Sequence, residues 1–288
     1  MFRRITIIIG FCATLAASGS GGAPAVAHLG VDEQIAVVDK LLEAKPGDAT
    51  LYLRRGELHR IHKDWNAAEK DYLQARKLNP DLPAVEFCLG RMKLEAGDPG
   101  QALEHLDRYL ELRPTDAKAL TTRGRALVKL GRSLAAAEDF TKALAHAGAG
   151  PSQPEVYLER ARALMAAGPQ HLDQALQGLD EGLQKLGEPV ALQLYAVELE
   201  VGARRYDAAL SRLDRLAAGS VRKEPWLMRK GAVLEAAGRP SEAREVYRQA
   251  LDAIDALPAS RRDNRAVERM EDEARAGLER LGRADATP

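Results

Sequence analysis

A repeat with a period of 34 is the feature that most constrains how this chain can fold. Alanines recur at that spacing in two runs of three, with one longer step between Ala136 and Ala175. The six alanines in this register are Ala68, Ala102, Ala136, Ala175, Ala209 and Ala243. A fixed period of this length is typical of a solenoid, in which one small structural unit is stacked on the next.

Two further positions keep the same phase. A glycine stands at one fixed distance before the alanine in four units, at Gly56, Gly90, Gly124 and Gly231. A bulky residue stands at the fourth position after every alanine, at Tyr72, Leu106, Phe140, Leu179, Leu213 and Tyr247. Only Gly or Ala lets two helix backbones approach closely where they cross, and large side chains fill the space beside the crossing. The spacing therefore predicts two helices per unit.

Prolines mark where the early units end. Pro46, Pro80 and Pro114 recur at the same period as the alanines. Proline lacks an amide hydrogen and cannot continue a helix, so we expect each to follow the second helix of a unit.

These positions resemble the signature of the tetratricopeptide repeat family. In the best-matching unit, residues 49–82, the matching residues are Tyr52, Gly56, Ala68, Tyr72, Ala75 and Pro80. The resemblance covers about residues 49–257. It implies an all-α fold, a right-handed superhelical solenoid of antiparallel helix pairs with about six repeats plus capping helices. Tyr109, Val197 and the missing final prolines of the last three units depart from the family pattern.

The register divides the chain into segments. We expect a signal peptide at 1–27, an N-terminal capping helix at 28–48, and a C-terminal capping helix and tail at 258–288. The six repeats between them are 49–82, 83–116, 117–150, 154–189, 190–223 and 224–257. The caps are expected because the open end of a solenoid exposes its core.

Both expected caps have an apolar face. In Val31–Ala44 the apolar residues are Ile35, Val38, Leu41 and Leu42. In Arg261–Leu281 they are Val267, Met270, Ala274, Leu278 and Leu281, at spacings of three and four. This spacing predicts an amphipathic helix.

Glycine and proline are dense in residues 147–154, between the third and fourth repeats. Such a segment could hinge two halves of three repeats each. The alternative, which we favour, is a longer surface loop with unbroken stacking.

Residues 1–27 have the layout of a secretory signal peptide. Arg3 and Arg4 precede an apolar run, 5–17, and the small residues 25–27 form a cleavage site. The run of about 13 residues is shorter than the roughly 20 that span a bilayer as a helix. We therefore expect an exported bacterial protein, periplasmic or secreted, whose mature chain does not insert into a membrane. The alternative is anchoring in the inner membrane by an uncleaved N-terminal segment.

Composition excludes several classes of protein. The 288 residues are 45% hydrophobic, which excludes a disordered chain. The 42 basic and 42 acidic side chains balance, which argues against nucleic-acid binding. Two cysteines exclude a disulfide scaffold, and cleavage would leave only Cys88, which we expect to be buried.

Motifs for catalysis or metal binding are scarce. The sequence has no Gly-rich phosphate loop, paired-cysteine site or nucleophile elbow. His59 and His62 lack an evident third metal ligand. Cleavage after Ala27 would make His28 a possible copper chelator, although an incidental histidine in a disordered start is the interpretation we favour. We therefore expect no enzyme, no cofactor and no metal.

The fold implied by the resemblance offers a long concave surface rather than a closed pocket. The resemblance implies that this surface holds a peptide or a segment of a partner protein. In the family register, the residue after the small Gly or Ala of the first helix points toward that surface. In units two to four these residues are Arg91, Arg125 and Arg162, with Lys118 and Lys129 nearby.

Guanidinium groups bind carboxylates through paired hydrogen bonds. The predicted ligand is therefore an acidic segment or a free C-terminus. Glu57 and Glu198 occupy the same position on either side, and the Lys and Asn set of the family's carboxylate clamp does not recur, since Leu53 and Glu57 occupy its first-unit positions.

Three alternatives remain open. The arginines could be a solvated ladder balanced by local acids such as Glu95. The chain could be a structural, self-associating solenoid, a possibility that leaves its oligomeric state open. It could also be a metal carrier or an enzyme accessory.

Overall fold

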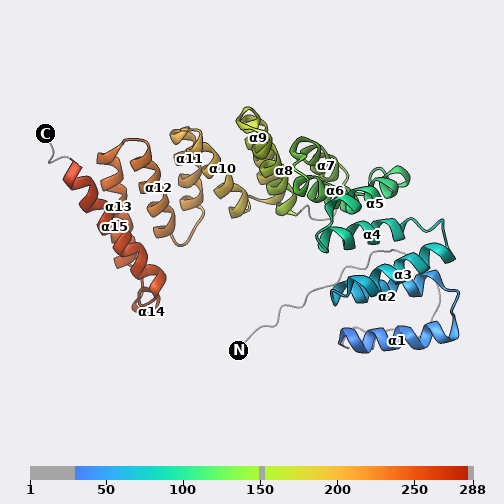
Figure 1. Ribbon diagram of the computed structural model, residues 1–288. Helices are drawn as coiled ribbons and strands as arrows, with labels where there is room; N and C mark the ends of the chain where they lie inside the picture. The colour runs from blue at the N-terminus through green and yellow to red at the C-terminus, as the bar shows by residue number, and fades with distance from the viewer. Residues whose placement is uncertain (1–29, 149–152, 285–288) are drawn as a thin grey trace. The chain divides into compact units, whose positions relative to one another are not determined.

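The computed structural model describes residues 30–148 and 153–284, so the predicted signal peptide and His28 lie outside the described residues. Within those two ranges the regular structure is helical, with no strand (Figure 1). The described residues divide into two compact units, with the boundary between Asp81 and Leu82.

The first unit is built from three helices, α1 (Val31–Ala44), α2 (Ala49–Ile61) and α3 (Trp65–Leu78). A Cβ atom on Gly56 of α2 would lie 2.6 Å from the ring of Tyr72 in α3. A glycine is therefore needed at this crossing. The helix α1 packs on α2 and buries Val38 and Leu42. Leu41, which the sequence placed on the same apolar face, is exposed, because adjacent residues in a helix point about 100° apart.

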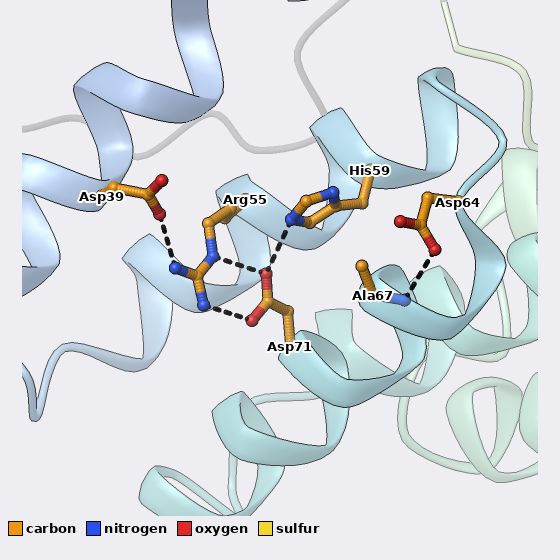
Figure 2. Close-up of polar contacts among 6 residues, drawn as sticks. All are labelled: Asp39, Arg55, His59, Asp64, Ala67 and Asp71. Atoms are coloured by element: carbon orange, nitrogen blue, oxygen red, sulfur yellow. Dashed lines mark hydrogen bonds and ion pairs between the residues drawn. The ribbon is translucent and has the colours of Figure 1, made fainter. Parts of the chain in front are cut away.

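A charged cluster joins the three helices of the first unit (Figure 2). Arg55 donates through Nε and Nη2 to both carboxylate oxygens of Asp71, at 2.8 and 2.7 Å, and through Nη1 to Asp39 at 2.6 Å. His59 Nε2 lies 3.8 Å from the same Asp71. His59 therefore belongs to this cluster. We call an arginine that bridges two aspartates in this way a clasp.

The second unit continues the same pattern of paired helices. Its helices are α4 (Ala84–Glu95), α5 (Pro99–Leu112), α6 (Ala117–Lys129), α7 (Ser133–Ala145), α8 (Pro154–Ala167), α9 (Leu172–Leu186), α10 (Val190–Gly202), α11 (Tyr206–Ala218), α12 (Glu224–Ala236), α13 (Pro240–Asp255), α14 (Ala259–Arg262) and α15 (Arg265–Ala284). A short 3-10 helix, η2 (Pro169–His171), occupies the longer turn between α8 and α9.

The close crossings predicted from the repeat recur in this unit. A Cβ atom on Gly90 would lie 2.6 Å from Leu106, and one on Gly124 would lie 2.8 Å from the ring of Phe140. A Cβ atom on Gly231 would lie 2.5 Å from the ring of Tyr247. The prediction of an all-α, tetratricopeptide-like stack of helix pairs is confirmed.

The clasp also recurs, in the third repeat. Arg123 in α6 donates to both oxygens of Asp139 in α7, at 2.7 and 2.8 Å, and to Asp107 in α5, at 2.7 Å. These residues follow Arg55, Asp71 and Asp39 by two full repeat periods. In the fourth repeat, Arg160 instead donates to the carbonyl oxygen of Gly178 and to Glu181, each at 2.9 Å.

The core is continuous from the third repeat into the fourth. Phe140 and Leu144 of α7 lie in one apolar cluster with Tyr157 and Ala161 of α8, although residues 149–152 are outside the described residues. The helices on the two sides of that segment pack directly against each other.

The last helix, α15, packs on α13 and buries Val267, Ala274 and Leu281. Its Arg280 donates to both oxygens of Glu235 in α12, at 2.8 and 3.1 Å. The helix α15 thus covers the apolar side that the last repeat would otherwise expose. Cys88 is buried in α4, as expected.

Candidate functional site

The three predicted arginines lie on consecutive first helices of the second unit. Arg91 is in α4, Arg125 in α6 and Arg162 in α8, each directly after the small residue at the helix crossing. The first helices of neighbouring repeats approach each other, α4 with α6 and α8 with α10. We call the surface that carries Arg91, Arg125, Arg162 and, in α10, Glu198 the first-helix face. Arg125 and Arg162 are exposed there, and Arg91 is half-buried.

Arg125 is held by an acid of the next repeat. Its Nε donates to Oε1 of Glu159 in α8 at 2.8 Å. The Arg125 side chain remains 46% exposed in this contact. A local acid does balance this arginine, and that acid comes from one repeat period further along the chain.

Arg162 makes the equivalent contact with an aromatic ring. Its guanidinium carbon lies 5.4 Å from the ring centre of Tyr195 in α10. Tyr195, like Glu159, stands two positions before the crossing residue of its own repeat. Burial raises the pKa of Tyr195, and the charge of Arg162 offsets part of that rise, so the ring stays neutral. Among the described residues, no carboxylate lies within ion-pair distance of Arg162, and this residue is exposed.

Arg91 is positioned by its own helix. Its guanidinium carbon lies 5.6 Å from the ring centre of Phe87, one turn earlier in α4. Phe87 in turn lies 5.4 Å from the ring of Tyr109 in α5. A cation stacked on a packed ring loses little further freedom when it binds an anion.

The two predicted lysines lie on the same helix as Arg125. Lys118 lies in the first turn of α6, Lys129 is the last residue of that helix, and both are exposed. Residues four and seven apart share one side of a helix. Lys118, Arg125 and Lys129 therefore form a row of cations along α6.

Glu57 and Glu198, which occupy the same register position on either side of the three arginines, lie in different surroundings. Glu198 is exposed on α10. Glu57, in the first unit, accepts a hydrogen bond from the hydroxyl of Tyr72 at 2.5 Å, so it takes part in the helix crossing.

Sequence reasoning missed the arginines that precede the small residue. Arg55, Arg123 and Arg160 each bond into a second helix, and Lys230 bonds Asp214 of α11 at 2.6 Å. The available signal was the pair of aspartates that accompanies Arg55 and Arg123 at the same offsets.

No group of three or more metal-binding side chains occurs within residues 30–148 and 153–284. In those same ranges no helix is long and apolar enough to cross a membrane.

Comparisons with solved structures find the same fold. A tetratricopeptide repeat protein from Parabacteroides merdae ATCC 43184 is 14% identical, with a TM-score of 0.51 over 85% of this chain and 92% of that one. The Naa15/Naa10 structure bound to HypK-THB is 17% identical, with a TM-score of 0.53 over 83% of this chain and 38% of that one. Yeast Tom70 is 14% identical, with a TM-score of 0.50 over 70% of this chain and 43% of that one.

The sequence itself matches the tetratricopeptide repeat family model at residues 53–117, 87–154, 121–175 and 196–260. Together these matches span more than half of the chain. With the glycine crossings and the paired helices, they show that this chain belongs to the tetratricopeptide repeat family.

Proposed function

We propose that the protein is a non-catalytic scaffold of the bacterial cell envelope that binds a segment of a partner protein on its first-helix face. The observation that carries this proposal is the repetition of an exposed or half-exposed arginine at one register position in three successive repeats. One structural neighbour, Naa15/Naa10, was solved bound to HypK-THB, which gives an example of this fold in a complex.

The ligand we propose is an acidic segment or a free C-terminus. Five cations lie on α4, α6 and α8, and an extended chain can contact several of them at once: Arg91, Arg125, Arg162, Lys118 and Lys129. Carboxylates bind guanidinium groups through two parallel hydrogen bonds, which favours them over other anionic groups of proteins.

The three arginines contribute unequally to this site. A ligand carboxylate at Arg125 competes with Glu159, whereas one at Arg162 has no acidic competitor among the described residues. Arg162, backed by the ring of Tyr195, is therefore the primary anchor, and the cations of α6 extend the site.

Partner binding at the first-helix face is tested by crosslinked affinity purification from the native envelope. The wild-type chain is compared with a triple variant carrying Arg91→Ala, Arg125→Ala and Arg162→Ala. A charge-matched control carries Arg113→Ala, Arg132→Ala and Arg261→Ala, three exposed arginines outside the face. We expect the first triple variant to stay folded and to lose a partner that the control retains.

If both triple variants recovered the partner equally well, the first-helix face would not be the binding site. Recovery of nothing except further copies of the same chain would favour the self-associating solenoid over the scaffold. Light scattering on the purified protein then gives the number of copies.

The envelope location rests on residues 1–27, which lie outside the described residues. We propose cleavage after Ala27, because a charged start, an apolar run and a small-residue site follow one another there. The intact mass of protein recovered from the envelope tests it. A mature chain starting at His28 supports a periplasmic or secreted protein, and a chain that retains residues 1–27 supports the membrane-anchored alternative.

A further inference from the structure

A polar groove lies between α9 and α11, which are the second helices of their repeats. Its volume is about 520 Å³. The α9 wall presents Asp173, Gln177 and Asp180, and the end of α10 contributes Glu200. Residues four and seven apart on α9 face the same side, so these polar groups form a continuous wall.

Two arginines from the α11 side neutralise part of this wall. Arg205 donates to Asp173 at 2.5 Å. Arg212 donates to both oxygens of Asp180, at 2.6 and 3.1 Å, and through Nε to Oε1 of Glu200 at 2.8 Å. One arginine therefore serves two carboxylates.

Glu181 also lines the groove, but its carboxylate is paired with two cations that do not line the groove. Its two oxygens accept from Arg160 and from Lys185, each at 2.9 Å. Counting Arg160 and Lys185, four cations face the four carboxylates of this region, so the shortage is local to Arg212. Arg212 alone bonds both Asp180 and Glu200, and these three groups together carry a surplus of one negative charge.

The surplus coincides with an unsatisfied atom. The Glu200 side chain is only 5% exposed, and no donor in the described part of the chain reaches its second oxygen, Oε2. A buried carboxylate oxygen without a donor is unfavourable, because burial removes the water that would otherwise bind it. A donor from outside the chain would complete this site.

The next repeat contains the same groove without this feature. Between α11 and α13 a cavity of about 530 Å³ has Asp207, Asp214 and Glu242 against Arg215, Lys230 and Arg239, so its charges balance. Leu234 follows Glu200 by one repeat period and takes its place. The two grooves lie one repeat period apart and differ at several charged positions, among them Glu200, replaced by Leu234, and Glu181, replaced by Arg215.

We propose that the groove between α9 and α11 binds a cationic side chain, a lysine ammonium or an arginine guanidinium, from a basic peptide segment. Such a group supplies both the missing positive charge and the donor that Glu200 lacks. This site is separate from the first-helix face, whose proposed ligand carries the opposite charge, and it does not depend on that proposal.

The groove is tested with a defined probe, a fluorescent tetralysine peptide blocked at both ends, titrated against the mature chain and followed by anisotropy. Gln177→Lys places a cation of the chain in the groove, at an exposed position whose side chain is not a member of these ion pairs. Ser211→Lys adds the same charge at the equivalent exposed position of the neighbouring groove.

We expect saturable binding by the wild type, at least tenfold weaker binding by Gln177→Lys, and no change with Ser211→Lys. Absence of saturable binding by the wild type would overturn the proposal. An equal loss in the two lysine variants would also overturn it, because it would show attraction by overall charge alone.

Glu200→Gln gives a second test of the same atom. It removes the surplus charge and should weaken tetralysine binding at least tenfold in a chain whose circular dichroism matches the wild type. Unchanged tetralysine binding by such a folded variant would show that Glu200 is not part of the binding site. If Glu200→Gln does not fold, the comparison of the two lysine variants decides the proposal.

Discussion

Gly124 separates two arginines that lie in very different surroundings. Arg123, on its N-terminal side, binds Asp139 and Asp107 in the neighbouring helices and is mostly buried by them. Arg125, on its C-terminal side, lies on the first-helix face with a half-exposed side chain. The same contrast recurs around Ala161, where Arg160 bonds to α9 and Arg162 lies over Tyr195 on the exposed face.

The comparison teaches that position relative to the crossing residue decides what an arginine does. The residue before the crossing turns toward the second helices and holds neighbouring helices together. The residue after it turns toward the first-helix face, where we propose that it meets a partner. Charge alone therefore does not identify a binding arginine in this repeat.

The largest expected effect comes from removing a clasp. Arg123→Ala leaves Asp139, whose side chain is 4% exposed, as a buried charge without its main partner. We expect the free energy of unfolding to fall by about 3 kcal/mol, the lower end for a broken buried pair because Arg123 is partly exposed. Urea denaturation measures it.

Arg125→Ala is the matched control for the clasp. It breaks an exposed pair, so we expect a loss of at most about 1 kcal/mol. Similar losses for Arg123→Ala and Arg125→Ala would abolish the distinction between the two sides of the helix.

A somewhat smaller effect is expected at the crossing itself. In Gly124→Leu the new Cβ atom would lie 2.8 Å from the ring of Phe140, which is fully buried. Overpacking of this kind costs about 1 to 3 kcal/mol, and a central repeat loses packing to neighbours on both sides. Thermal melting measures the change.

Gly202→Leu in α10 is the control for this crossing, because nothing lies within 4 Å of its Cβ position. We expect its melting temperature to stay close to that of the wild type. If Gly124→Leu melted like Gly202→Leu, the crossing would not be the constraint that the repeat implies.

The smallest effect concerns a partly exposed ion pair at the last helix. Burial acts to raise the pKa of Glu235, but the hydrogen bonds from Arg280 and Tyr247 outweigh it and hold the pKa below its ordinary value. A carboxylate with a lowered pKa in the folded state stabilises the protein above its unfolded pKa, about 4.3, and loses this effect as the pH falls further.

The wild type should therefore melt at a higher temperature than Glu235→Gln at pH 7, and the difference should shrink as the pH falls below the ordinary glutamate pKa of about 4.3 and through the lowered folded-state pKa. Arg280→Ala should show the same pH profile, since it removes the principal donor. A difference between wild type and Glu235→Gln that does not change with pH would contradict this account of the helix end.

Much of the fold could be predicted from the sequence, because the crossings impose a spacing that is visible without coordinates. Gly124 and Phe140 lie in the expected contact. The exposure of Leu41 was not predicted, because an apolar residue at the edge of a helix face can lie on either side of the packing boundary.

The candidate site was predictable in part. The register located Arg91, Arg125 and Arg162 on successive first helices, but the partners of these arginines come from the next repeat or from the ring one turn earlier. Glu159 and Tyr195 occupy equivalent positions in successive repeats but have unrelated side chains. The repeat pattern in the sequence therefore does not identify them. Glu200 was missed for a similar reason, since burial of a single acid depends on the packing of α9 and α11 around it.

The central claim is that the arginines after the crossing residue form a binding face for acidic ligands. Its most direct test is a titration of a fluorescent pentaglutamate peptide with a free C-terminus against the wild type and the two triple arginine variants. We expect saturable binding that weakens at least tenfold when Arg91, Arg125 and Arg162 are replaced by alanine, and that is unchanged when Arg113, Arg132 and Arg261 are replaced. Equal affinity of the first triple variant and the wild type would contradict the claim.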